Sequence, residues 1–119
     1  MINRSHRFHG YNSLRRTYGS GQSVRGSLLS LKYAHTNRNS WRAAVVVSRK
    51  VNGSAVVRNR IRRRVYETVR KLSPNITEPY DMVITIYDDA VTDLPQKKLE
   101  ELVVDKLVAA KKLKSSPSL

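Results

Sequence analysis

Cysteine is missing from the 119-residue chain, which excludes disulfide bonds and thiolate metal sites. The absence is also compatible with a reducing compartment. No run of about 18 apolar residues occurs, so the sequence predicts no transmembrane helix. The basic N-terminus is not followed by an apolar segment, and we therefore expect no signal peptide. Together these absences favour a cytoplasmic protein.

Acidic side chains are nearly absent from the first part of the chain. Residues 1–72 hold 17 Lys and Arg residues but one acid, Glu67, for a net charge of +16, whereas residues 73–119 carry a net charge of −2. Fourteen of the 17 basic residues are arginines, which suit bidentate phosphate contacts. About two thirds of the chain is therefore predicted to face a polyanion. An anionic membrane would also attract this charge, but the basic helix expected up to about Leu72 has no Trp or Phe on its apolar stripe to enter a bilayer, so we expect no membrane partner.

Side chains in catalytic arrangements are missing as well. His6, His9 and His35 have neither metal-ligand spacing nor nearby carboxylates. Asp88 and Asp89 are adjacent, which is typical of a turn. There is no phosphate-binding glycine loop and no nucleophile triad. The sequence thus predicts no catalytic residue, no metal site, no cofactor on the protein and no small-molecule substrate.

The densest charge lies in residues 58–64, which contain five arginines and one asparagine. Apolar residues recur through this region at helical spacing, namely Val57, Ile61, Val65, Val69 and Leu72. This spacing predicts a helix that begins after a cap at Asn52 or Ser54 and ends near Leu72, with its arginines exposed. Such a helix suits phosphate binding, although most charge runs are only solvated surface. Because the first acid is Glu67, we favour nucleic-acid binding.

Alternating apolar residues and turn signals predict the remaining elements. We expect a short helix over about 12–18, strands over 27–35, 41–49 and 82–87, and a last helix from Pro95. The order helix, strand, strand, helix, strand, helix predicts an α+β fold, a single-domain split βαβ sandwich with helices packed on a central sheet.

The valine run at 45–47 predicts a strand buried on both faces. We expect one RNA-binding domain over residues 1–112 and a flexible tail over 113–119, which is polar.

One motif resembles a known family. Arg58-Asn59-Arg60, between Ala55-Val56-Val57 and Ile61-Arg62-Arg63, resembles the RNR signature of the bacterial ribonuclease P protein subunit. Val47-Ser48-Arg49-Lys50-Val51 is similar to that family's strand exit, usually V-S-K-K-V. The resemblance covers roughly residues 7–112 in element order.

This resemblance implies a protein that assists a catalytic RNA in removing the 5′ leader from precursor tRNA. Catalysis and the Mg²⁺ ions would lie on the RNA, and the partners would be that RNA and precursor tRNA. The family also implies a left-handed crossover between parallel strands, against the usual rule.

The resemblance further implies roles for particular residues. Those expected to bind RNA are Arg49, Lys50, Arg58, Asn59, Arg60, Arg62, Arg63 and Arg64. The candidates for a cleft that holds the leader are Phe8, Leu14, Tyr18 and Lys32. Leu14 departs from the family's usual Phe, Lys32 stands where an aromatic residue is common, and the loop 51–54 is one residue longer than in many members. Tyr18 could stack on a base or pack on the sheet, and both interpretations stay open.

Three other functions compete with this one. A non-catalytic ribosomal or assembly protein explains the charge and fold equally well, but not the string Ala55–Arg63 beside Ser48–Lys50. A stand-alone nuclease would need a carboxylate cluster or a catalytic histidine. A DNA-binding helix could use the arginines, but no dimerisation signal sets a half-site spacing.

Overall fold

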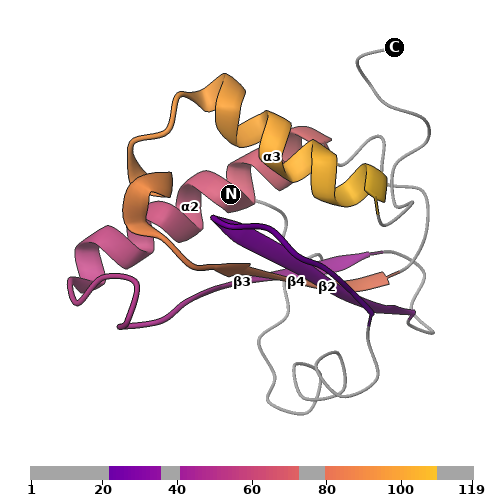
Figure 1. Ribbon diagram of the computed structural model, residues 1–119, viewed down its shortest axis with the longest axis horizontal. Coiled ribbons are helices and arrows are strands. Elements are labelled where there is room, and N and C mark those ends of the chain that lie inside the picture. The colour runs from indigo at the N-terminus through magenta and orange to yellow at the C-terminus, as the bar shows by residue number, and fades with distance from the viewer. Residues whose placement is uncertain (1–21, 36–40, 73–79, 110–119) are drawn as a thin grey trace.

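The computed structural model of the chain describes residues 22–35, 41–72 and 80–109, and these ranges form a sheet with helices on one face (Figure 1). The sheet has four strands in the order β1-β2-β4-β3. The elements in chain order are β1 (Gln22–Val24), β2 (Leu29–His35), β3 (Arg42–Val47), α2 (Ala55–Leu72), β4 (Tyr80–Ile86), the 3-10 helix η3 (Asp89–Thr92) and α3 (Gln96–Ala109). The α+β fold predicted from the sequence is confirmed.

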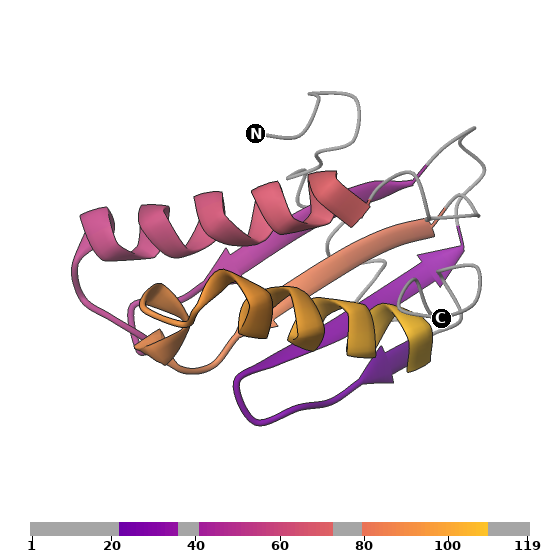
Figure 2. The ribbon, with the colours of Figure 1, turned by 90° about the horizontal axis from the view of Figure 1, so that it is seen from above.

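The crossover through α2 has unusual handedness. β3 and β4 are parallel neighbours, while β2 pairs antiparallel with both β4 and β1. In Figure 2 the helices lie in front of the sheet, β3 and β4 run from right to left, and α2 returns from left to right. The step from β3 to β4 goes down the page, so the β3-α2-β4 connection is left-handed. This is the handedness that the resemblance implied.

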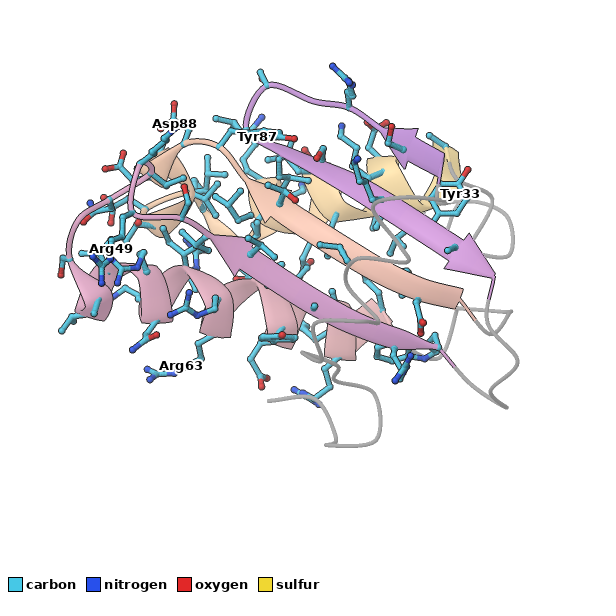
Figure 3. The ribbon with its side chains drawn as sticks, turned by 90° about the horizontal axis from the view of Figure 1, so that it is seen from below. Tyr33, Arg49, Arg63, Tyr87 and Asp88 are labelled. Carbon is cyan, nitrogen blue, oxygen red and sulfur yellow. The ribbon has the colours of Figure 1, made fainter. Side chains whose placement is uncertain are left out.

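Alternate strand residues face the helices, because successive side chains of a strand point to opposite faces, and most of them are buried. The strand residues in this core are Leu29, Leu31, Ala43, Val45, Val47, Met82, Ile84 and Ile86. The helices contribute Ile61, Val65, Tyr66, Val69, Leu99, Val103 and Leu107. We call the opposite side, which neither α2 nor α3 covers, the open face (Figure 3).

Most predicted boundaries agree with the structure to within a few residues. The valine run is a partial exception, because Val45 and Val47 are buried in the core whereas Val46 is half-buried on the open face. β1 was missed, since three residues are too few to show a period. The helix expected over 12–18 and the tail 113–119 lie outside the described residues.

The start of α2 depends on polar caps, because its first turn contains no acidic residue. Ser54 Oγ accepts a hydrogen bond from the Val57 N–H at 3.3 Å. Asn52 Oδ1 in turn accepts one from the Ser54 N–H at 2.8 Å. Of the two capping candidates predicted from the sequence, Ser54 caps the helix, and Asn52 supports the cap by bonding to the backbone of Ser54.

β3 is an edge strand, and one of its backbone groups bonds to a side chain of α2. The hydroxyl of Tyr66 accepts the Val45 N–H at 3.1 Å, and Tyr66 is buried. The bond therefore ties α2 to the middle of the strand in addition to the apolar packing.

We predict that Tyr66→Phe lowers the free energy of unfolding by about 1–3 kcal/mol, because the buried Val45 N–H loses its acceptor while the ring still packs. Urea unfolding would measure the change. Tyr87→Phe is the matched control, since the hydroxyl of Tyr87 bonds to a side chain from an exposed position and should cost less. Equal losses in the two variants would contradict the prediction.

Candidate nucleic-acid interface

The arginines of α2 are displayed by the burial of one stripe of the helix. Ile61 and Val65 are fully buried against the sheet, so the opposite side of the helix faces away from it. Arg60 and Arg63 are exposed, and Figure 3 shows Arg63 pointing away from the sheet. These two guanidinium groups have the placement that phosphate binding requires.

Asn59 and Arg62 form a local pair on the same helix. Arg62 Nη2 donates a hydrogen bond to Asn59 Oδ1, a contact across one turn. Asn59 is exposed and Arg62 is half-buried. The amide thus orients a neighbouring guanidinium. Contact of either residue with RNA stays a prediction.

Arg49 and Lys50 lie in the loop between β3 and α2, and both are exposed. The loop turns back on itself through a hydrogen bond from the Val51 N–H to the Ser48 carbonyl at 3.1 Å. Arg49 therefore stands near the N-terminal end of α2 (Figure 3), where the helix dipole also favours anions, and Lys50 follows it in the same loop.

Arg58 holds this same loop. Its Nη1 donates to the carbonyls of Asn52 and Gly53 at 3.0 and 2.9 Å, and its side chain is half-buried. Asn52 Nδ2 also donates to Asp89 Oδ2 at 3.0 Å, which links the loop to η3. The loop is thus held by Arg58 on one side and by Asp89 on the other. An RNA contact of Arg58 remains a prediction, in addition to this local role.

Arg64 points toward η3 and the start of α3. Its Nη1 donates to the carbonyls of Val91 and Thr92 at 2.7 and 2.8 Å. Its Nη2 donates to the Leu94 carbonyl at 2.5 Å and lies 3.5 Å from Gln96 Oε1. An RNA contact of Arg64 is untested, but the structure uses its guanidinium as a clamp between segments far apart in sequence.

The contacts of Arg64 belong to a polar seam between α2 and α3. Gln96 Nε2 donates to Thr68 Oγ1 at 3.2 Å, and Thr68 Oγ1 donates to the Arg64 carbonyl at 2.9 Å. Lys71 Nζ bonds to Glu100 Oε1 at 2.7 Å. Residues 64, 68 and 71 have helical spacing beside the apolar stripe, which is the signal that could have revealed this seam in the sequence.

The open face contains one of the predicted leader-cleft residues. Lys32 pairs with Val83, which pairs with Ala44, so the three form one row across the sheet. Lys32 is half-buried, and Ala44 and Val83 are buried. The other candidates, Phe8, Leu14 and Tyr18, lie outside the described residues.

Sequence reasoning missed Tyr87, which follows β4. Its side chain is 52% exposed, and its hydroxyl lies 2.7 Å from Ser30 Oγ. The alternation of β4 would place residue 87 on the open face, with 81, 83 and 85.

The described residues contain no group of three side chains able to hold a metal ion. Within the same ranges, no helix is long and apolar enough to cross a membrane.

Comparisons with known proteins agree with this architecture. A family model described as Ribonuclease P matches residues 2–111. The ribonuclease P protein component of Chloroflexus aurantiacus is 41% identical over 100 residues, which cover 84% of this chain and 73% of the relative. That of Roseiflexus castenholzii is 34% identical over 102 residues, covering 86% and 83%.

Solved structures share the fold. The RNase P protein of Staphylococcus aureus superposes with a TM-score of 0.80 at 22% identity, covering 92% of this chain and 98% of the other. The protein from Thermotoga maritima gives a TM-score of 0.74 at 20% identity, covering 83% and 92%.

We predict that Arg64→Met destabilises the fold and that Arg63→Met does not. Loss of the Arg64 guanidinium leaves three backbone carbonyls without their donor, so the free energy of unfolding should fall by about 1–3 kcal/mol. Arg63→Met should change it by less than about 0.5 kcal/mol, because Arg63 is exposed. Chemical denaturation would measure both, and the reverse order would refute the clamp.

We also predict a small acid-dependent loss of stability at the α2–α3 seam. The hydrogen bond from Lys71, with a further one from Gln96, lowers the pKa of Glu100 below its ordinary value. The stabilisation is therefore present above the unfolded-state pKa of about 4.3 and is lost as pH falls through the lower folded-state pKa. Unfolding of Glu100→Gln and the parent protein at pH 7 and pH 3 should show a smaller stability difference at pH 3. A constant difference would exclude this linkage.

Proposed function

Because the chain belongs to the ribonuclease P protein family, we propose that it is the protein subunit of a ribonucleoprotein that removes the 5′ leader from precursor tRNA. The observation that best supports an RNA partner is the arginine-bearing side of α2. Arg60 and Arg63 are exposed there, Arg49 and Lys50 stand at the same end of the helix, and the first acid along the helix is Glu67. This surface would dock against the catalytic RNA.

In this proposal the chemistry belongs to the RNA, which would also bind the Mg²⁺ ions. The protein neutralises phosphates where the catalytic RNA and its substrate approach each other. The adjacent carboxylates Asp88 and Asp89 are consistent with chemistry that belongs to the RNA. Asp88 caps the Ala90 N–H, and Asp89 accepts from Asn52, so both carboxylates serve the fold around η3.

Preference for precursor over mature tRNA would come from binding the leader, the part that is removed. The proposed site is a cleft at the open face of the sheet, where Lys32 of β2 lies; the further candidates Phe8, Leu14 and Tyr18 lie outside the described residues. A single strand can cross a sheet and stack its bases on side chains, which a paired helix cannot do. The proposed partners are thus the catalytic RNA and precursor tRNA, and the proposed location is the cytoplasm.

A cleavage assay on precursor tRNA at low magnesium tests this proposal. It compares the protein alone, a bacterial ribonuclease P RNA alone, and the two combined. We expect cleavage at the mature 5′ end only in the combination. Tight binding to that RNA without stimulation of cleavage would instead favour a general RNA-binding protein, and cleavage by the protein alone would favour a nuclease.

We predict that Arg60→Ala combined with Arg63→Ala reduces holoenzyme activity steeply at low magnesium and less at high magnesium, because added cations replace the lost charge. The slope of log affinity for the catalytic RNA against log salt should become shallower by about 1.5 to 2. Arg70→Ala is the matched control, because it removes an exposed charge from the other end of α2, where Arg70 pairs with Glu67. An equal loss of activity at both magnesium concentrations would argue against charge neutralisation.

A further inference from the structure

We propose that Tyr87 is a stacking site for one base of single-stranded RNA, at the end of the open face nearest the loop that carries Arg49 and Lys50. This inference rests on the proposed function and adds to it a residue that contacts the leader. Tyr87 was not among the residues predicted from the sequence, and its assignment depends on three features of its surroundings.

The first feature is that Tyr87 is fixed while its side chain is half exposed. Its backbone N–H donates to the Leu28 carbonyl at 2.8 Å, which continues the β2–β4 pairing one step beyond the strand. Its hydroxyl lies 2.7 Å from Ser30 Oγ on β2. The ring is therefore held at both ends, yet 52% of the residue is exposed. A ring ordered in advance loses little conformational entropy when a base stacks on it.

The second feature is the position of Tyr87 on the sheet. Val47 of β3 pairs with Ile86 of β4, so the next residues along each strand, Ser48 and Tyr87, leave the sheet at the same edge. Lys32 lies in the row of Val83, four residues before Tyr87. Strand geometry places those two rows about 13 Å apart. Ser30, Ala44 and Val83 on this face are buried, whereas Tyr87 at its end is exposed, so Tyr87 is a position on this face that a base can reach.

The third feature is the charge around this edge. Arg49 and Lys50 follow Ser48 and are exposed. Two acids, Asp88 and Asp89, also adjoin Tyr87 and keep their negative charge while they accept hydrogen bonds from the Ala90 N–H and from Asn52. An aromatic ring with basic side chains on the neighbouring loop is a combination that suits single-stranded nucleic acid.

An apolar protein partner fits this edge less well. The large apolar side chains that the described residues expose are Val56, Tyr87 and Val108, on α2, after β4 and on α3 respectively. Tyr87 is therefore not part of an extended apolar patch of the kind that protein partners use. A base of single-stranded RNA needs only one ring and a neighbouring charge.

An abasic scan of the leader tests the proposal. A series of precursor tRNAs would each lack the base at one leader position. The affinity of each would be measured for holoenzyme reconstituted with the parent protein, with Tyr87→Leu or with Tyr87→Phe. For the parent we expect one leader position at which removal of the base weakens binding roughly tenfold. Tyr87→Leu should weaken binding of the intact leader by a similar factor and abolish the penalty at that position alone. Tyr87→Phe keeps the ring and should retain the penalty.

Thermal unfolding of each variant shows whether weaker binding comes from loss of the fold or from loss of base stacking. Tyr87→Met is a second variant that lacks the ring. The proposal is overturned if the variants that lack the ring weaken intact and abasic leaders equally. It also fails if the parent prefers precursor over mature tRNA but shows no position-specific penalty, a result that leaves the proposed function intact. No preference of the parent holoenzyme for precursor tRNA would overturn both.

Discussion

Burial of one narrow stripe of α2 is the constraint on which the rest of this structure depends. Ile61, Val65 and Val69 are at most 1% exposed, and they pack on a sheet whose central strands are apolar on that side. A helix that commits this stripe to the core cannot rotate, so the direction of every arginine along it is set. The left-handed crossover is compatible with this packing because α2 still packs on the sheet, over β3 (Figure 2).

The arginines of α2 consequently have different tasks although they are neighbours in sequence. Arg60 and Arg63 face outward, Arg58 holds the loop that precedes the helix, and Arg64 clamps η3 and the start of α3. Total positive charge therefore overstates the number of side chains offered to RNA. A guanidinium satisfied by backbone carbonyls stabilises the fold, and it adds to the electrostatic field without contributing a directed phosphate contact.

Much of this could be predicted from the sequence, because the decisive signals are local. The period of α2, its caps and the Arg58–Arg60 motif all lie within one segment, and they led to the correct fold and family. The spacing of residues 64, 68 and 71 could have indicated a polar seam on α2, but not the acceptors of Arg64, which lie 27 to 30 residues away at positions set by the tertiary fold. Tyr87 was missed for a related reason: its exposure and its bond to Ser30 depend on how β2 pairs with β4.

The bond between Tyr66 and Val45 also bears on how the protein behaves before it meets RNA. β3 lies at the edge of the sheet, and an edge strand with unpaired N–H groups is a template for strand addition and aggregation. The Tyr66 hydroxyl occupies a donor in the middle of that strand, and α2 packs beside it. Another chain would have to displace a buried side chain to pair along this edge, so strand addition at β3 is hindered by a contact that does not depend on charge repulsion.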